Sequence, residues 1–126
     1  MHLDTHVVAW LFEGHTHLLP AAVRRRLDSE PLVISPIVEL ELAYLHEIGR
    51  TSKPPGFVLP ELRAKVGLTV SGAPLRAVVD AAIGLAWTRD PFDRLIAAQA
   101  LAENETLLTK DDRIRKHLEL AVWDAG

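Results

Sequence analysis

Short apolar runs alternate with longer segments of helical periodicity along this chain, and that alternation constrains the fold more than any other feature. The runs predict strands at residues 1–5, 31–35, 68–70, 105–109 and 120–124. Helical patterns lie between them, at residues 5–13, 21–29, 36–49, 73–87, 91–102 and, more briefly, 110–119. Because parallel strands are joined through crossover helices, this order predicts an α/β fold. Its central, mostly parallel sheet of four to five strands would be flanked by helices.

One segment shows neither pattern. Residues 50–60, RTSKPPGFVLP, contain two adjacent prolines and a glycine, which favour turns over regular structure. We therefore expect a long loop there, followed by a short helix within residues 61–67.

Length and composition fit a single domain spanning residues 1–126. With 48% hydrophobic residues the chain can bury a core, yet it has no apolar run long enough to span a membrane. The opening MHLDTHVVAW lacks the basic start and cleavage site of a signal peptide. The absence of cysteine excludes a disulfide framework and a thiolate zinc site. These features lead us to expect a cytoplasmic protein with no membrane association.

The formal net charge of -3 argues against general coating of nucleic acid. Local clusters of basic residues can still build a binding face on an acidic protein. The distribution of lysine and arginine therefore matters more than their total.

Two aspartates lie three residues apart in the segment WTRDPFDRLIAAQALA, residues 87–102. Asp90 precedes Pro91, which is typical of a helix N-cap followed by the first helical position. Asp93 shares its helix face with apolar residues such as Ile96. Asp93 is therefore either a first-turn acid stabilised by the helix dipole or an inward carboxylate that needs a partner.

Other acidic residues directly follow predicted strands, where parallel sheets collect their functional groups. Asp4 ends the first strand and could equally cap the helix that follows. Asp111 and Asp112 follow the strand at 105–109, and for either residue alone a solvated turn is the simpler interpretation.

Glu39 and Glu41 lie on the helix after the second predicted strand. Glu41 is one or two turns from Tyr44 and Ile48, so the periodicity predicts that Glu41 faces inward and Glu39 faces solvent. A buried glutamate paired with an arginine is the alternative explanation for Glu41.

Together, Asp4, Glu41, Asp93 and Asp111 are predicted to lie on the C-terminal side of the sheet. Carboxylates that converge raise one another's pKa unless a divalent cation neutralises them. Ligands that are all oxygen atoms favour Mg²⁺ or Mn²⁺ over zinc. The six histidines do not form a competing site, and we expect them at the surface.

Four segments occur in the order and spacing of a known family: LDTHVVAWL, ISPIVELELAYLHEIGR, TRDPFDRLIAAQAL and LLTKDDRIRKH. Through them, essentially the whole chain resembles the PIN-domain nucleases and, among these, the VapC-like toxins of toxin–antitoxin pairs. The resemblance implies a PIN-like three-layer α/β/α fold. It also implies that the catalytic and metal-binding residues are Asp4, Glu41, Asp93 and Asp111, with Asp90 as a candidate fifth ligand. Glu39 stays open as an alternative to Glu41, and Asp112 as an alternative to Asp111.

The activity implied by this resemblance is Mg²⁺- or Mn²⁺-dependent hydrolysis of RNA phosphodiester bonds by an activated water. Thr5, Ser35 and Thr109 adjoin the acids and could orient ligands or water, although helix capping explains Ser35 equally well. An acidic centre repels phosphate, so RNA binding also needs cations. The candidates near the acids in sequence are Arg89, Arg94, Lys110, Arg113, Arg115 and Lys116. A solvated helix, or an Arg94 ion pair, would explain part of this set without RNA.

The resemblance further implies a homodimer and an inhibitory VapB-like antitoxin. Two other functions stay open: a PIN fold that binds RNA or protein without turnover, and a Mg²⁺-binding phosphoacceptor receiver domain. The receiver domain is the weaker alternative because it needs an acidic pair after the first strand and an aspartate after the third. The chain has only Asp4 at the first of these places and no acid directly after LVIS.

Overall fold

Five short strands form one parallel sheet in the computed structural model, which describes residues 1–124. The strands are β1 (His2–Leu3), β2 (Val33–Ile34), β3 (Thr69–Val70), β4 (Leu107–Leu108) and β5 (Ala121–Val122). Their spatial order is β3-β2-β1-β4-β5, and each neighbouring pair is parallel. The predicted α/β fold is confirmed, and β1 lies at the centre of the sheet.

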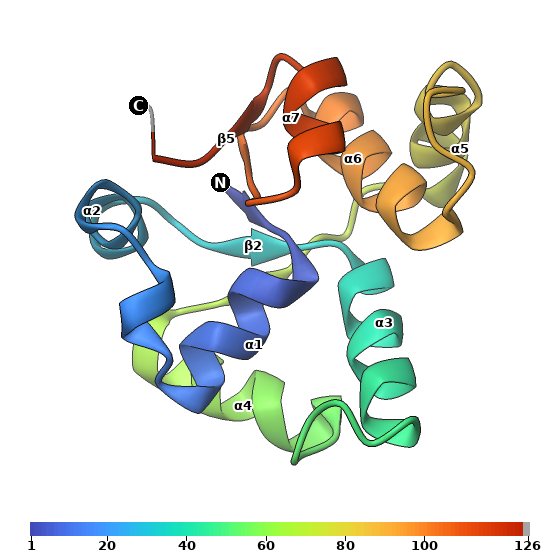
Figure 1. The fold of residues 1–126 in the computed structure, drawn as a ribbon. Coiled ribbons are helices and arrows are strands. Elements are labelled where there is room, and N and C mark those ends of the chain that lie inside the picture. The colour runs from blue at the N-terminus through green and yellow to red at the C-terminus, as the bar shows by residue number, and fades with distance from the viewer. Residues whose placement is uncertain (125–126) are drawn as a thin grey trace.

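Helices cover both faces of this sheet, which gives three layers (Figure 1). In Figure 1, α1 and α4 lie below β2, while α6 and α7 lie above it. The helices are α1 (Thr5–Glu13), α2 (Ala21–Ser29), α3 (Pro36–Glu47), α4 (Pro55–Val66), α5 (Leu75–Ile83), α6 (Pro91–Glu103) and α7 (Asp112–His117), with a 3₁₀ turn, η1, at Thr16–Leu18. No helix within residues 1–124 is long and apolar enough to cross a membrane.

Helix α6 is the most deeply buried helix of the fold. Five consecutive residues, from Ile96 to Ala100, are buried, because α5 packs against one side of α6 and the core lies against the other. Three of the five are alanines, whose small side chains let neighbouring elements approach closely. This burial holds the first turn of α6, with its two aspartates, in a fixed position relative to the sheet.

The expectation of a long loop over residues 50–60 is wrong, because α4 begins within it at Pro55. Pro55 occupies the first helical turn, where its missing N–H removes no intrahelical hydrogen bond. Pro60 lies inside the helix and does remove one. Val58 and Leu62, four residues apart, are both buried and anchor the helix to the core. Tertiary packing therefore outweighs the local preference of the prolines.

The expectation that the histidines lie at the surface is wrong for His2. Its exposed fraction is 1%, because β1 is the central strand and is covered on both faces. The His2 Nε2 atom lies 3.2 Å from Oε1 of Glu103 at the end of α6. This contact joins the first strand to the helix above it.

Candidate functional site

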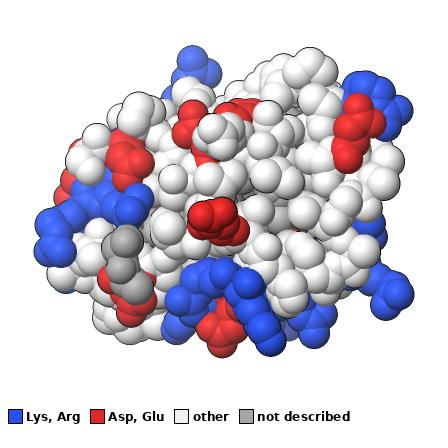
Figure 2. Space-filling model, turned by 90° about the horizontal axis from the view of Figure 1, so that it is seen from above, with Lys and Arg blue, Asp and Glu red and all other residues white. Residues whose placement is uncertain are grey.

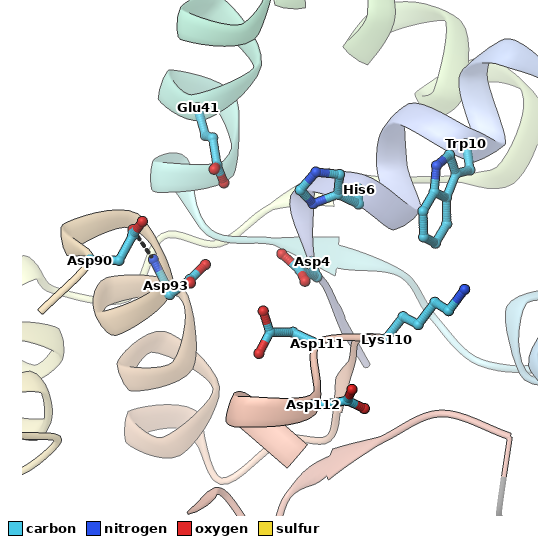
Figure 3. Close-up of a pocket in the computed structure, with 9 residues that line it drawn as sticks. All are labelled: Asp4, His6, Trp10, Glu41, Asp90, Asp93, Lys110, Asp111 and Asp112. Atoms are coloured by element: carbon cyan, nitrogen blue, oxygen red, sulfur yellow. Dashed lines mark hydrogen bonds between the residues drawn. The ribbon is translucent and has the colours of Figure 1, made fainter. Parts of the chain in front are cut away.

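An acidic pocket of about 460 Å³ opens where β1 and β4 end (Figure 3). It is lined by Asp4, His6, Trp10, Glu41, Asp90, Asp93, Lys110, Asp111 and Asp112. All four acids selected from the sequence are among these residues, and so is Asp90. The structure therefore brings together side chains that lie more than a hundred residues apart in the chain.

Asp4 directly follows β1 and is 6% exposed. Its Oδ1 atom accepts a hydrogen bond of 2.7 Å from the Thr5 backbone N–H, as an N-cap of α1. Its Oδ2 atom accepts one of 2.6 Å from the hydroxyl of Thr109, which follows β4. Asp4 therefore caps α1, as one of its two interpretations predicts, and it also lines the pocket.

Glu41 reaches the pocket from α3, and its Oε1 atom accepts a hydrogen bond from the Thr5 hydroxyl. Glu39 is exposed and is not among the pocket residues, as the helical periodicity predicts. The apolar face used for that prediction is nevertheless partly exposed: Tyr44 is 46% and Ile48 is 49% accessible. The buried residues of α3 are Val38 and Leu42, and Glu41 lies beside them at the edge of the buried face.

Asp90 and Asp93 divide their tasks at the start of α6. The Oδ1 atom of Asp90 accepts a hydrogen bond of 3.0 Å from the Asp93 backbone N–H, which confirms Asp90 as the N-cap. The Asp93 side chain points toward Asp4 and Asp111 in Figure 3. Asp93 is therefore the inward carboxylate of the pair.

Asp111 and Asp112 at the start of α7 differ in another way, because here the helix cap is also the inward acid. Asp111 is the N-cap, and its Oδ1 atom accepts a hydrogen bond of 2.9 Å from the Ile114 N–H. The Asp112 side chain is 96% exposed and pairs with Nη2 of Arg115 at 2.6 Å. In Figure 3 the Asp111 carboxylate points toward the centre of the pocket, and that of Asp112 points away from it.

The clustered carboxylates disturb one another's ionisation. Burial, followed by the charges of Asp90, Asp4, Asp111 and Glu41, raises the pKa of Asp93 to about 7. Burial also raises the pKa of Asp4, although the hydrogen bond from Thr109 opposes this. It raises the pKa of Glu41 against the hydrogen bond from Thr5. Three acids therefore favour their neutral form more than free carboxylates do.

No lysine or arginine compensates these charges directly. Within residues 1–124, Asp4, Glu41 and Asp93 form no ion pair with a basic side chain. Lys110 lines the pocket, but it is not paired with any of the three. The explanation of Glu41 as a buried acid paired with an arginine is thereby excluded.

The donor chemistry of the pocket fits a hard divalent cation, because the convergent groups offer carboxylate oxygens. As they stand, no three histidine, aspartate or glutamate side chains in the described part of the chain form a ready metal site. Hydrogen bonds account for part of this separation: Asp4 is turned to Thr109 and Glu41 to Thr5. Like-charge repulsion opposes any closer approach in the absence of a cation. A cation would need these side chains to rotate toward the centre.

The predicted supporting residues behave differently from one another. Thr5 and Thr109 donate hydrogen bonds to Glu41 and Asp4, and so hold two of the acids. Ser35 caps α3 and donates to Oε1 of Gln99 at 2.8 Å, away from the acids. The capping explanation is correct for Ser35. The sequence did not predict that Gln99 would be the partner of Ser35, because a polar residue within an apolar helical stretch gives no signal of which distant residue it will contact.

The predicted basic residues also separate into groups. The Arg94 guanidinium donates to the carbonyls of Ala82 and Ile83, at 2.8 Å and 3.2 Å, and so caps the C-terminus of α5. Arg115 is engaged with Asp112 and the Lys110 carbonyl. Lys110 lines the acidic pocket, and Arg89 is exposed.

Arg113 and Lys116 line a neighbouring pocket rather than the acidic one. On the face of the molecule shown in Figure 2, lysine and arginine side chains gather in groups and are not spread evenly. Local basic clusters therefore exist on this acidic protein.

Two residues of the pocket, His6 and Trp10, were not selected from the sequence. Both lie on α1, two and six residues after Asp4, and their rings lie 6.1 Å apart. His6 and Trp10 are four residues apart and share a helix face with each other, but at two and six residues from Asp4 they do not share its face, so helical spacing gave no signal that they line the pocket.

The chain belongs to the PIN domain family, whose model matches residues 1–119. Ribonuclease VapC22 of Mycobacterium tuberculosis is 34% identical over 129 aligned residues, covering 96% of this chain and 96% of that protein. The predicted resemblance to the VapC-like PIN proteins is thus confirmed.

A solved relative agrees with this assignment at the level of the fold. The crystal structure of VapBC2 from Rickettsia felis, bound to a DNA fragment from their promoter, contains a similar chain, with a TM-score of 0.62. The two are 22% identical, and the match covers 98% of each chain. The three-layer PIN-like architecture predicted for this chain is therefore confirmed.

Proposed function

We propose that this protein is a metal-dependent endoribonuclease and acts as the toxin of a toxin–antitoxin pair. The observation that carries this proposal is the convergence of Asp4, Glu41, Asp93 and Asp111 on one pocket, where none of them forms an ion pair within residues 1–124. The relative named ribonuclease VapC22 supports RNA as the substrate.

In this proposal the four carboxylates hold Mg²⁺ or Mn²⁺, and Asp90 stays mainly a helix cap. A divalent cation bound there would supply the Lewis acidity that activates water and offsets the charge developing on a phosphodiester. Thr109 and Thr5 hold the Asp4 and Glu41 carboxylates at the edge of the pocket, and these carboxylates would rotate toward the ion when it binds. Lys110, at the rim, offers a positive charge to the phosphate that enters.

The partners proposed for this chain are RNA, a VapB-like antitoxin and a second copy of itself. The solved relative is described as VapBC2, which supports the antitoxin. Exposed apolar side chains on α3, at its C-cap and on α5 suit a homodimer interface: Leu40, Tyr44, Ile48, Leu75 and Ile83.

The direct test is cleavage of single-stranded RNA by the purified protein with Mg²⁺, with Mn²⁺ and with a chelator. Cleavage that needs the divalent ion and is lost in Asp93→Asn is the expected result. A Glu39→Gln protein is the matched control, because Glu39 is an exposed acid that does not line the pocket and should retain activity. Metal-independent cleavage, or equal loss in both variants, would contradict the proposal.

Membership in the PIN family leaves no support for the receiver-domain alternative. A PIN fold that binds RNA without turnover is the remaining alternative, and the same assay separates it. Such a protein would bind RNA but show no divalent-dependent cleavage.

A further inference from the structure

A second pocket, of about 450 Å³, adjoins the acidic one. It is lined by Trp87, Asp112, Arg113, Lys116 and His117, and we call it the Trp87–His117 pocket. Asp112 lines both pockets, so they meet at this residue. A chain molecule lying in the acidic pocket can therefore continue into the second pocket.

Two aromatic rings form one wall of the Trp87–His117 pocket. The rings of Trp87 and His117 are parallel to within 6°, with centroids 5.1 Å apart, as in an offset stack. Trp87 comes from the loop before α6 and His117 from the end of α7. His117 is exposed, and its Nδ1 atom lies 3.0 Å from the Arg113 carbonyl, which holds the ring in place. The two rings therefore form a flat surface of fixed position, and the His117 ring is the one accessible to solvent.

The Trp87 indole has one polar atom, and it does not face an acceptor in the described part of the chain. Its Nε1 atom is buried and has no hydrogen-bond partner within residues 1–124. Tryptophan N–H groups that are buried usually find an acceptor. Because this nitrogen is buried, Trp87 contributes the face of its ring to the wall and not a hydrogen bond.

Positive charge surrounds the aromatic wall. Arg113 and Lys116 both come from α7, are exposed, and form no ion pair within the described part of the chain. The one acid in the pocket, Asp112, is already paired with Arg115. The two free cations are therefore available to an anionic ligand.

We propose that the Trp87–His117 pocket binds one nucleotide of single-stranded RNA next to the bond that is cleaved. The base extends the stack on the His117 ring, and its phosphate lies between Arg113 and Lys116. A flat aromatic surface beside two cations suits a nucleotide better than an acidic peptide, which would use the cations alone. A base must leave its own stack to bind here, so paired RNA is excluded. This inference rests on the proposed ribonuclease function, because it assigns a subsite of that substrate.

The test compares His117→Ala and His117→Phe with the parent, and uses His17→Ala as the control. His17 is also an exposed histidine, but it lines neither pocket. Two quantities are measured: KM and kcat for Mg²⁺-dependent cleavage, and the Kd for a fluorescent single-stranded RNA in an Asp93→Asn background. We expect His117→Ala to raise KM and Kd about tenfold, with kcat changed by less than about twofold. His117→Phe keeps an aromatic face and should bind nearly as the parent, as should His17→Ala.

A second comparison changes the RNA instead of the protein. Two oligonucleotides each lack a single base, one on the 5′ side and one on the 3′ side of the cleaved bond. One of these two oligonucleotides lacks the base that would stack on His117. The parent and His117→Ala should bind that oligonucleotide with equal Kd. Trp87→Leu should weaken binding of the intact RNA in the same manner as His117→Ala.

The outcomes separate this inference from the proposed function. If the parent cleaves RNA and His117→Ala leaves both KM and Kd unchanged, the subsite is wrong and the ribonuclease function stands. If His117→Ala weakens binding of RNA that the parent does not cleave, nucleotide binding in this pocket is supported, but the ribonuclease function is wrong and so is the placement of that nucleotide beside a cleaved bond. A parent that neither binds nor cleaves RNA overturns both, and equal weakening by His117→Ala and His117→Phe also overturns the stacking role.

Discussion

The carboxylate of Asp90 accepts a hydrogen bond from the backbone N–H of Asp93, while the Asp93 side chain turns toward Asp4 and Asp111. Burial first, and the charge of Asp90 second, raise the pKa of Asp93 to about 7. One aspartate thus stabilises the helix start and the other extends from it into the acidic pocket. Replacing Asp90 should therefore affect the helix start, and replacing Asp93 should affect the pocket.

Replacing Asp90 should act through helix capping. Asp90→Ala is expected to lower the free energy of unfolding by about 1 kcal/mol. Asp90→Asn should keep nearly the stability of the parent, because an amide oxygen also accepts a hydrogen bond from the Asp93 N–H. Urea unfolding of the metal-free proteins measures both. An Asn variant as unstable as the Ala variant would show that charge, and not the acceptor, is what matters at this position.

Replacing Asp93 should change how stability depends on pH. A carboxyl whose pKa rises from 3.8 to about 7 on folding stays protonated in the folded state while the unfolded chain ionises. The metal-free parent therefore loses stability as pH rises from about 4 through about 7, and Asp93→Asn removes this loss. Melting curves without metal should show the variant gaining on the parent from about pH 4 to about pH 7, with little further change above that. A constant difference across that range contradicts the raised pKa.

A divalent cation should stabilise the folded protein. Millimolar Mg²⁺ or Mn²⁺ is expected to raise Tm, because the ion binds the folded pocket and not the unfolded chain. The increase should be larger at about pH 8 than at about pH 6, since protonated Asp93 competes with the ion. Differential scanning calorimetry measures the shift, with Asp93→Asn as the variant that should lose most of it. An identical shift in that variant would place the ion elsewhere.

The two glutamates of α3 should differ in catalysis. Glu41→Gln keeps an oxygen for the Thr5 hydroxyl but loses the charge, so we expect a folded protein with RNA cleavage at least about 100-fold slower. Glu39→Gln, on the exposed side of the same helix, should retain the parent rate. Initial rates with Mg²⁺ give the comparison. Full activity in Glu41→Gln would remove this residue from the site.

Arg94 should matter for stability and not for RNA. Its guanidinium caps α5 through the Ala82 and Ile83 carbonyls, so Arg94→Ala should lower the free energy of unfolding by about 1 kcal/mol. KM for RNA should stay unchanged in Arg94→Ala, whereas Lys110→Ala should raise KM, because Lys110 lines the acidic pocket. A rise of KM in Arg94→Ala at unchanged stability would return Arg94 to the RNA-binding residues.

Much of the fold could be predicted from local patterns. The apolar runs located all five strands, and the Ser35 and Asp90 caps with their prolines located two helix starts. The prediction failed at α4, where Pro54, Pro55 and Pro60 signal a loop while the burial of Val58 and Leu62 stabilises a helix. Local propensity and tertiary packing disagree there, and packing contributes more.

The acids of the pocket could be selected because each follows a strand or shares a helix face, and those are local properties. Their mutual arrangement could not be predicted, because it depends on contacts such as the hydrogen bond between Thr109 and Asp4, which are 105 positions apart in the chain. The same limit hid His2 in the central strand and the partner of Ser35 in α6.

The sequence by itself determined which segments become strands and helices, and which acidic residues stand at their ends, because periodicity and capping act over a few neighbouring residues. Only the tertiary structure decided that β1 lies at the centre of the sheet, that Arg94 caps α5, and that Trp87 meets His117. These relations join distant parts of the chain, and they form only when the whole core packs and brings those parts together.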